Sequence, residues 1–411
     1  MLKIKPKEIQ AEADPTGGPL KFALVIPALN EEEAIDQTLE NALNSREEIL
    51  KSTAVDEMRI LFVNDGSTDN TQAIADRYDE VEKISLYKNM GYGYAIQQGF
   101  LATDAQLVGF MDADGTCNAA SFIGLINLLL QTDSDIVLGS RINPESQMPR
   151  VRRWGNRIFS RLIGWVSGQN LSDPASGIRV IRRERLKRMM PLPTGLHFTP
   201  AMSAIAVLNP NLAISEIPVP YCERVGKSKL SVLKDGIRFI WSILFASLCY
   251  NPLRLSISLA VLALLAGAGI GSVLLSTPLD LLLTGIVLGL FIFLAFLAVS
   301  MGVLAHQINY LLIESREIPG KLPGLLRWLS DGKWLLAVGA LCWLGSAGGA
   351  LVALLTSFFN RIVWLVFLAF FLLGGWMLFV GVLFRIIWAV RQRRDAEHND
   401  PFDRKNRREA Q

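Results

Sequence analysis

Four long apolar segments occupy the C-terminal part of this 411-residue chain, at about residues 255–276, 281–305, 334–359 and 362–384. None of them contains Asp, Glu, Lys or Arg, and each has the roughly 20 residues that a helix needs to cross a bilayer. Helices of that length and uniformity are rare in the cores of water-soluble proteins. The sequence therefore predicts an α-helical membrane domain of four spans, over residues 255–390.

The basic residues between these segments predict how the chain is oriented. The link between the first two spans has none and the link between the last two has only Arg361, whereas the loop 306–333 and the tail 391–411 are basic. By the positive-inside rule, that loop and both termini are expected in the cytoplasm of a cell-membrane protein. The polar N-terminal extension (1–20) lacks the apolar stretch of a signal peptide, so the region that follows is expected to stay in the cytosol.

Before residue 230, short apolar runs alternate with helix-like stretches. Strand–helix alternation with nearly continuous apolar strands predicts a Rossmann-like α/β domain over 21–229, with a parallel sheet covered on both faces. A dinucleotide-dependent oxidoreductase is disfavoured, because the turn after the first strand has no glycine-rich fingerprint. The expected strands are 22–27, 58–63, 84–87, 107–112 and 135–140, and the expected helices are 31–50, 69–80, 92–103 and 119–130.

The run LVGFMDADGT (107–116) ends a predicted strand on two acids, Asp112 and Asp114. In an open α/β sheet the ligand site lies at the carboxyl ends of the strands. Two hard oxygen ligands on one turn suit Mg²⁺ or Mn²⁺, which bind phosphates with only one or two protein carboxylates. The alternative is an ordinary Asp-Gly turn with solvated acids. Zinc is not supported, because the four cysteines and three histidines are scattered.

The second predicted strand ends in VNDGSTDNT (63–71), where Asp65 lies at the strand end and Gly66 permits a tight turn. This pattern is also typical of an ordinary strand-to-helix turn. Because Asp112 and Asp114 end a neighbouring strand, we expect Asp65 to point toward a base or a ribose.

A set of ordered motifs gives this chain a resemblance to a known family. They are PALNEE (27–32), NDGSTDNT (64–71), the spaced Asn89, Gly91, Ala95 and Gly99, DADG (112–115), LGSR (138–141) and DPASGIR (173–179). Over about residues 22–254 the chain resembles family-two glycosyltransferases of the GT-A fold, and more narrowly the polyprenyl-phosphate group that includes dolichol-phosphate-mannose synthase. The resemblance implies a GT-A-type cytosolic domain.

The resemblance also implies roles for individual residues. The metal would be Mg²⁺ or Mn²⁺, held by Asp112 and Asp114. Catalytic roles would fall to Asp112, Asp114, Arg141 and Asp173, and the acceptor phosphate would meet Arg141 and Lys227. From the basic segment 150–161 we also expect at least one of Arg152 and Arg153 to meet that phosphate. The donor would contact Pro27, Leu29, Glu31, Val63, Asp65, Asp112, Ala113, Asp114, Thr116, Arg224 and Lys229.

Three positions depart from the family pattern. Asn64 stands where Asp is frequent, GYG replaces the usual GKG around residue 93, and residues 195–200 lack the expected acid. No role is therefore assigned to residues 195–200, and His197 is as well explained by packing.

Two basic or amphipathic segments suggest contact with lipid. Arg152 and Arg153 lie in 150–161, where arginines alternate with apolar residues, and an acceptor site there competes with a solvated or lipid-facing helix. Nucleic acid is not expected as a partner of a membrane-anchored chain. Residues 230–254 predict amphipathic interface helices, and the GxxxG spacings in the spans permit packing within one chain or a homo-oligomer.

These observations predict an inverting transfer of a sugar from a GDP- or UDP-sugar to a polyprenyl phosphate. A processive polysaccharide synthase is the first alternative, but the Q-x-x-R-W motif of that class is not matched, because Arg150 stands where the Gln should be. A non-catalytic lipid-sugar binder or flippase component is the second, and spans without ionisable residues argue against a polar translocation path.

Overall fold

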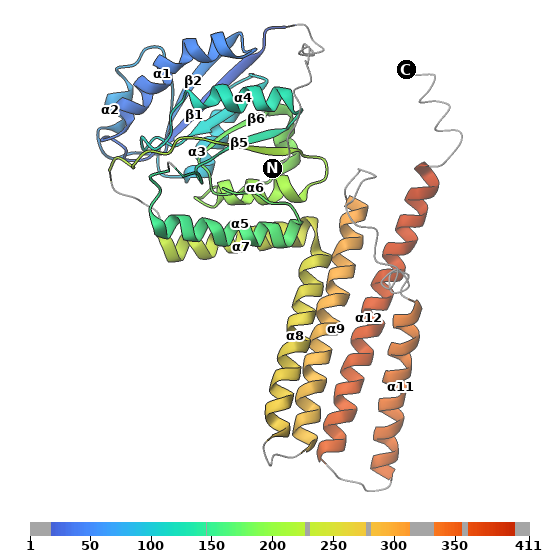
Figure 1. The fold of residues 1–411 in the computed structure, drawn as a ribbon. Helices are drawn as coiled ribbons and strands as arrows, with labels where there is room; N and C mark the ends of the chain where they lie inside the picture. The colour runs from blue at the N-terminus through green and yellow to red at the C-terminus, as the bar shows by residue number, and fades with distance from the viewer. Residues whose placement is uncertain are drawn as a thin grey trace. The chain divides into compact units, whose positions relative to one another are not determined.

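The structure is a computed structural model that describes residues 18–144, 146–226, 231–276, 281–312, 333–355 and 361–398. The chain divides into two compact units, Met1–Ser247 and Leu248–Gln411. The first unit is an α/β fold and the second is a set of long helices (Figure 1).

A seven-stranded sheet forms the centre of the first unit, in the order β3-β2-β1-β4-β6-β5-β7. Every neighbouring pair is parallel except those that β6 makes with β4 and β5. The sheet is thus mixed and GT-A-like, and the prediction of a wholly parallel sheet is wrong at β6. The strands are β1 (Lys21–Ala28), β2 (Glu57–Asn64), β3 (Glu82–Ser85), β4 (Leu107–Met111), β5 (Ile136–Ser140), β6 (Ile178–Arg182) and β7 (Ile214–Pro218).

The register places the carboxyl ends of the parallel strands on one edge of the sheet. Ala28 pairs with Asn64 and Phe110 with Val25, so β1, β2 and β4 all end there. Because β6 runs antiparallel, its first residue, Ile178, pairs with Met111 at the same edge. The loops after β1, β2, β4, β5 and β7 and the loop before β6 therefore meet at this edge.

Helices cover both faces of the sheet, and residues of β1 alternate between them. Leu24 packs in the core with α1 (Ile35–Ser52) and α4 (Ser121–Gln131), which contact each other. Val25 points the other way, where Gly99 of α3 (Tyr92–Leu101) lies so close that an added Cβ would overlap it. On that face α3 contacts α6 (Phe198–Leu208), so the expected cover on both faces is confirmed (Figure 1).

Two predicted helices differ from the observed ones by four or more residues at one end. The amides of Glu31 and Glu32 donate to Thr71 Oγ1 (2.8 Å) and to an Asp69 carboxylate oxygen (3.2 Å), and the residues that follow form a turn. The first helix begins at Ile35 rather than at residue 31. The second, α2, covers only Thr71–Ala75 of the predicted 69–80.

Helices α5 (Arg150–Ser167) and α7 (Val232–Tyr250) run side by side in Figure 1. The Phe159 and Phe239 rings, one from each helix, lie 5.4 Å apart between centroids. Helix α5 ends at Gly168, whose left-handed backbone (φ 81°) glycine adopts without strain.

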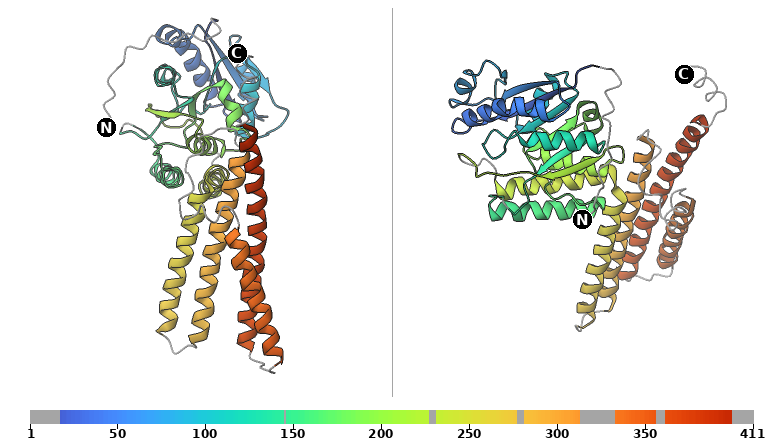
Figure 2. Two further views of the ribbon diagram at one scale, coloured as in Figure 1. Left: turned by 90° about the vertical axis from the view of Figure 1, so that its right-hand side faces the viewer. Right: turned by 45° about the horizontal axis from the view of Figure 1, so that its top comes forward.

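The described part of the second unit contains α8 (Pro252–Leu275), α9 (Leu281–Leu312), α11 (Lys333–Leu355) and α12 (Arg361–His398), with α8 against α9 and α11 against α12 (Figure 2). Within the described residues, three stretches are long and apolar enough to cross a membrane: Pro252–Leu275, Val287–Asn309 and Lys333–Val352. Three of the predicted spans are thus confirmed as long apolar helices. The fourth stays a prediction, since the described apolar part of α12, Ala369–Arg385, is shorter.

Candidate active site

A cavity of about 540 Å³ opens at the edge of the sheet where the strand ends meet. Its lining includes ten of the residues predicted from the sequence, and its size is typical of small-molecule sites. Those ten are Pro27, Leu29, Glu31, Asp65, Asp112, Ala113, Asp114, Arg141, Arg152 and Arg224. The sheet register explains why these residues lie together, because they lie at or just after the ends of five different strands or at the start of α5.

The two acids after β4 are held by different neighbours. Asp112 accepts a hydrogen bond of 2.5 Å from the Tyr92 hydroxyl, and Asp114 accepts one of 2.6 Å from Thr116. Burial and the adjacent Asp114 charge raise the pKa of Asp112 to about 7. Asp112 also lies against the backbone of Gly177, where an added Cβ would overlap the carboxylate. The acids therefore form a crowded anionic pair that needs a positive partner.

Arg224 supplies that partner in the structure. Its Nη1 donates to an Asp114 oxygen at 2.7 Å and its Nη2 to Glu31 at 2.7 Å. Arg224 follows β7, so this one guanidinium connects the loops after β1, β4 and β7. Arg224, Glu31 and Asp114 therefore lie together, as expected if all three contact the nucleotide-sugar donor. Their roles in binding stay predictions.

The carboxylates of this site suit a divalent cation that also binds a phosphate of the substrate. Two carboxylates on one turn are hard oxygen ligands, and Mg²⁺ commonly takes only one or two of these together with phosphate oxygens. Among the described residues no group of three or more His, Cys, Asp or Glu side chains could hold a metal by itself. A cation at Asp112 and Asp114 would therefore need a phosphate ligand, and it would compete with Arg224.

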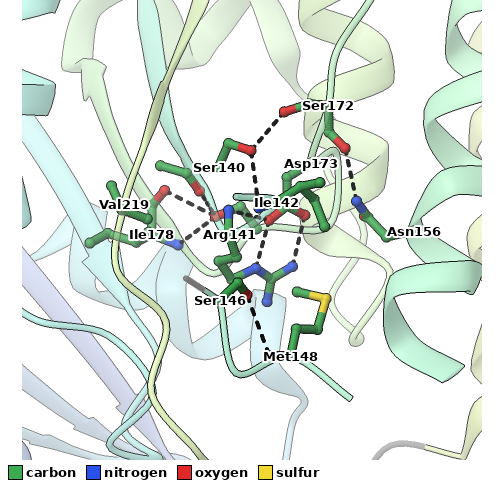
Figure 3. A network of polar contacts seen from close by, with 12 residues as sticks. Ser140, Arg141, Ile142, Ser146, Met148, Asn156, Ser172, Asp173, Ile178 and Val219 are labelled. Atoms are coloured by element: carbon green, nitrogen blue, oxygen red, sulfur yellow. Dashed lines mark hydrogen bonds and ion pairs between the residues drawn. The ribbon is translucent and has the colours of Figure 1, made fainter. Parts of the chain in front are cut away.

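Arg141, predicted to face the acceptor phosphate, forms a closed ion pair (Figure 3). Its Nε and Nη2 donate to the two oxygens of Asp173 at 2.7 and 2.9 Å, and its backbone amide donates there as well. Asp173 is fully buried. Arg141 is still among the residues that line the cavity, and its guanidinium carbon lies 5.6 Å from the centroid of the Tyr221 ring. Asp173 thus orients Arg141 and is not itself part of the cavity lining.

Asp65 has a structural task in addition to its place in the cavity. Its two oxygens accept hydrogen bonds from the backbone amides of Met90 and Gly91, at 2.7 and 2.9 Å. These bonds fix the loop that begins α3, and burial raises the pKa of Asp65 above its usual value. The carboxylate is therefore already bonded to the protein, and contact with a base or ribose stays a prediction.

The two arginines predicted on α5 occupy different places. Arg152 lines the cavity, whereas Arg153 donates to the carbonyl of Ser146 at 2.8 Å and is not among the lining residues. Val63, Thr116 and Asp173 are buried and are also not among the lining residues. Lys227 and Lys229 lie outside the described residues.

Several lining residues were not predicted from the sequence. Tyr92, Tyr221, Arg238 and Phe239 belong to this set, as do Gly195, Leu196 and Thr199 from the segment that was left without a role. The departure from GKG could have identified Tyr92, because it puts a neutral tyrosine where the family usually has a charged lysine. Such a change of charge beside an acid of the phosphate site indicates a residue of the site. His197, in contrast, is half-buried outside the lining, and burial lowers its pKa.

Comparisons with known proteins identify the family. Residues 23–190 match the model described as Glycosyl transferase family 2. A dolichyl-phosphate hexose transferase of Haloferax volcanii is 32% identical over 226 residues, which cover 52% of this chain and 89% of that protein. The low-salt glycan biosynthesis hexosyltransferase Agl6 of the same organism is 30% identical over 53% of this chain, but the match spans only about half (52%) of Agl6.

Among solved structures, glucosyl-3-phosphoglycerate synthase from Mycobacterium tuberculosis, in complex with Mn²⁺ and UDP, is similar with a TM-score of 0.45 and 20% identity. That likeness covers 56% of this chain and 81% of the other. With the family model matched over residues 23–190 and the hexose transferase matched over most of its length, this chain is a glycosyltransferase that belongs to family 2.

Proposed function

We propose that the protein transfers a sugar from a nucleotide-diphospho-sugar, with a GDP or UDP carrier, to a polyprenyl phosphate, and that it inverts the anomeric centre. The observation that carries the proposal is the charge arrangement of one cavity, whose lining includes Asp112 and Asp114 after β4, Arg141 after β5 and Arg152 at the start of α5. The name of the hexose transferase from Haloferax volcanii, which specifies a dolichyl phosphate, supports the acceptor class.

The acceptor explains why the site needs no general base. A phosphate monoester is largely dianionic at neutral pH, because its second pKa is about 6, so its oxygen is already a nucleophile. The bond from that oxygen to the anomeric carbon forms as the bond to the nucleotide diphosphate breaks. A single displacement of this kind inverts the anomeric centre.

The chain's own residues manage the resulting charge. A divalent cation at Asp112 and Asp114 would supply electrostatic stabilisation of the leaving diphosphate. Arg141 and Arg152 offset the charge of the approaching acceptor through charge-assisted hydrogen bonds. Asp173 holds the Arg141 side chain in place, so little reorganisation is required when the phosphate arrives. Arg224 would leave Asp114 to contact the donor phosphates.

Exposed apolar residues support a position at the membrane surface. On α7, Leu233, Ile237, Trp241 and Phe245 recur every fourth residue, and all are more than half exposed. A helix with such a stripe and nearby basic residues is typical of an interfacial helix. We propose that α7, from the segment 230–254 expected at the interface, holds the cavity near the head groups of the lipid.

The proposed topology has four spans, with the sites of donor and acceptor on the cytosolic side. The membrane unit would then comprise 255–390, followed by the basic tail 391–411. Single cysteines placed at Ser315, Asn360 and Asn399, outside the described residues, test this in a cysteine-free background. Only a cysteine at 360 should react with a membrane-impermeant thiol reagent in intact cells, and all three should react after permeabilisation. Reaction at 315 or 399 from outside would overturn the orientation.

The experiment that tests the reaction is nucleotide release by the purified full-length protein, with and without a polyprenyl phosphate, over a panel of labelled GDP- and UDP-sugars. Acceptor-dependent release, with one sugar per lipid phosphate by mass spectrometry, is expected. A product that carries a growing sugar chain would show a polysaccharide synthase, and no release with any donor would contradict the proposal.

A further inference from the structure

Glu216, near the end of β7, bonds to the segment that carries one partner of the Arg141 ion pair. The backbone amide of Ser172 donates to both of its carboxylate oxygens, at 3.1 and 2.9 Å, and the Ser172 hydroxyl donates to one of them at 2.8 Å. Such charge-assisted bonds are about twice as strong as bonds between neutral groups. Glu216 is not among the residues that line the cavity, so any effect on the site must pass through Ser172.

Ser172 is bonded in turn to Ser140, since their hydroxyl oxygens lie 2.6 Å apart (Figure 3). A hydroxyl has a single proton, and that of Ser172 is donated to Glu216, so Ser140 is the donor in this contact. The Ser140 hydroxyl also accepts a bond of 3.3 Å from the backbone amide of Ile142. Hydrogen bonds therefore run in one direction, from Ile142 through the two serines to the Glu216 carboxylate.

This series of hydrogen bonds lies directly beside the ion pair of the site. Ser140 precedes Arg141 in the chain, and Ser172 precedes Asp173. The residues before the two partners are thus bonded to each other, and Glu216 holds one of them. A shift of Ser172 would move Asp173, whose oxygens accept the bonds from the guanidinium and the amide of Arg141.

Helix α5 holds the same segment through its carbonyl groups. Asn156 donates to the carbonyl of Ser172 at 2.9 Å, and the hydroxyl of Ser160 donates to the carbonyl of Leu171 at 2.6 Å. These contacts are neutral, whereas the contact with Glu216 is charge-assisted. Loss of Glu216 would therefore leave the segment attached to α5 and without its acceptor on the β7 side.

A simpler task for Glu216 would be to protect the edge of the sheet. β7 is an edge strand, and a charged side chain there discourages pairing with another chain. That task requires no bonding partner, yet the carboxylate takes both polar hydrogens of Ser172. The geometry thus favours a role within the protein.

We propose that Glu216 is a positioning residue for the acceptor side of the site: by holding Ser172 it keeps Asp173 and Arg141 in the geometry in which Arg141 faces the acceptor phosphate. The inference rests on the proposed function, which gives Arg141 that task. Glu216 itself contacts neither substrate. Positioning affects rate strongly, because a misplacement of about 1 Å can lower turnover by about a hundredfold.

Glu216→Ala tests the effect on the reaction. We expect kcat/KM for a polyprenyl phosphate to fall about tenfold, because Arg141 is held less firmly, and the KM for the nucleotide-sugar to stay unchanged. Glu216→Gln should keep most of the activity, because its amide oxygen can accept both bonds from Ser172. Ser215→Ala, which removes a bond to Ser134 from the neighbouring position of β7, is the matched control and should change neither constant.

The kinetic outcomes separate positioning from a merely structural task. Wild-type constants in Glu216→Ala, or an equal change for donor and acceptor, would overturn the proposal. A loss in Glu216→Gln as large as in Glu216→Ala would overturn it as well, since the bonds to Ser172 could then not be the cause. A wild-type protein that transfers no sugar to any polyprenyl phosphate would instead contradict the proposed function.

Hydrogen exchange of the protein without substrates tests the inference independently of turnover. In Glu216→Ala, and more weakly in Ser172→Ala, peptides 138–144 and 170–177 should exchange faster, because the amides of Arg141 and Ser172 lose firmly held acceptors. Exchange in β4 should not change. Wild-type exchange in peptide 138–144 of both variants would show that Glu216 does not hold Arg141 and would overturn the proposal.

Discussion

Two ion-pair clusters flank the site cavity, and they differ in how firmly they are closed. Arg141 and Asp173 share two side-chain hydrogen bonds of 2.7 and 2.9 Å, and Asp173 is fully buried. Arg224 instead divides its guanidinium between Glu31 and Asp114, and its Nε has no hydrogen-bond partner although it is buried.

The difference indicates which cluster can exchange its partners. Removing one member of a buried, bidentate ion pair lowers the stability of the protein strongly, because the other charge is left buried without a partner. A guanidinium divided between two acids, on a loop between β7 and α7, can be replaced there by another cation. The Arg141 cluster is therefore a fixed part of the site, and the Arg224 cluster is where the donor and its cation are expected to bind.

The largest effect is predicted for the exchangeable cluster. Asp114→Asn should lower turnover about a thousandfold, since stabilisation of the leaving diphosphate by a cation is worth several kcal/mol. Steady-state nucleotide release measures it, and circular dichroism checks that the fold is kept. Excess chelator should have the same effect on the wild-type protein, and full activity in chelator would contradict the metal assignment.

Stability should respond to the fixed cluster instead. Asp173→Asn should lower the free energy of unfolding by about 3 kcal/mol, because Arg141 then keeps its charge without a counter-ion. Thermal unfolding in detergent measures this. The control is Asp133→Asn, which removes a surface pair with Arg182 at an almost fully exposed acid, and a change within about 0.5 kcal/mol is expected there. Equal losses in both variants would mean that the Arg141 pair is no more than another surface contact.

The same contrast explains what the sequence could predict. Asp112 and Asp114 end an apolar run, and the rule that parallel strands end at one edge places them with Asp65 and Glu31. The pairing of Arg141 with Asp173 joins residues 32 positions apart and depends on the antiparallel β6. No local pattern carries that information.

Strand β6 itself was missed because two arginines interrupt its apolar run IRVIR. Arg179 is nevertheless fully buried, since its Nε and Nη2 donate to the carbonyls of Ser176 and Pro174 and its guanidinium lies 6.0 Å from the Phe110 ring. Desolvation lowers its pKa to about 10, which leaves it charged at neutral pH. Its Nη1 is buried without a hydrogen-bond partner among the described residues. A buried arginine held by carbonyls of a nearby loop cannot be recognised from hydropathy.

A smaller effect is predicted on the acceptor side. Arg152→Ala should raise the KM for polyprenyl phosphate ten- to a hundredfold, or by about 1.5–3 kcal/mol, and should leave the donor KM unchanged. Arg153→Ala is the matched control on the neighbouring position, because Arg153 bonds to Ser146 and does not line the cavity. If the two variants behave alike, the basic character of α5 matters as a whole and no single contact to phosphate is made.

The smallest effect is predicted at Tyr92, which connects the exchangeable cluster to α3. Its hydroxyl donates to Asp112 at 2.5 Å, and burial together with the Asp112 charge raises the pKa of Tyr92 well above its usual value, so the phenol stays a donor. Tyr92→Phe removes this bond and leaves Asp112 less restrained, at a cost of about 1 kcal/mol. The concentration of Mn²⁺ needed for half-maximal binding, measured by titration calorimetry with the donor nucleotide present, should then change about fivefold. Tyr94→Phe, on the same helix outside the cavity, should leave it unchanged, and an equal change there would show that Tyr92 acts through helix packing and not through the acid.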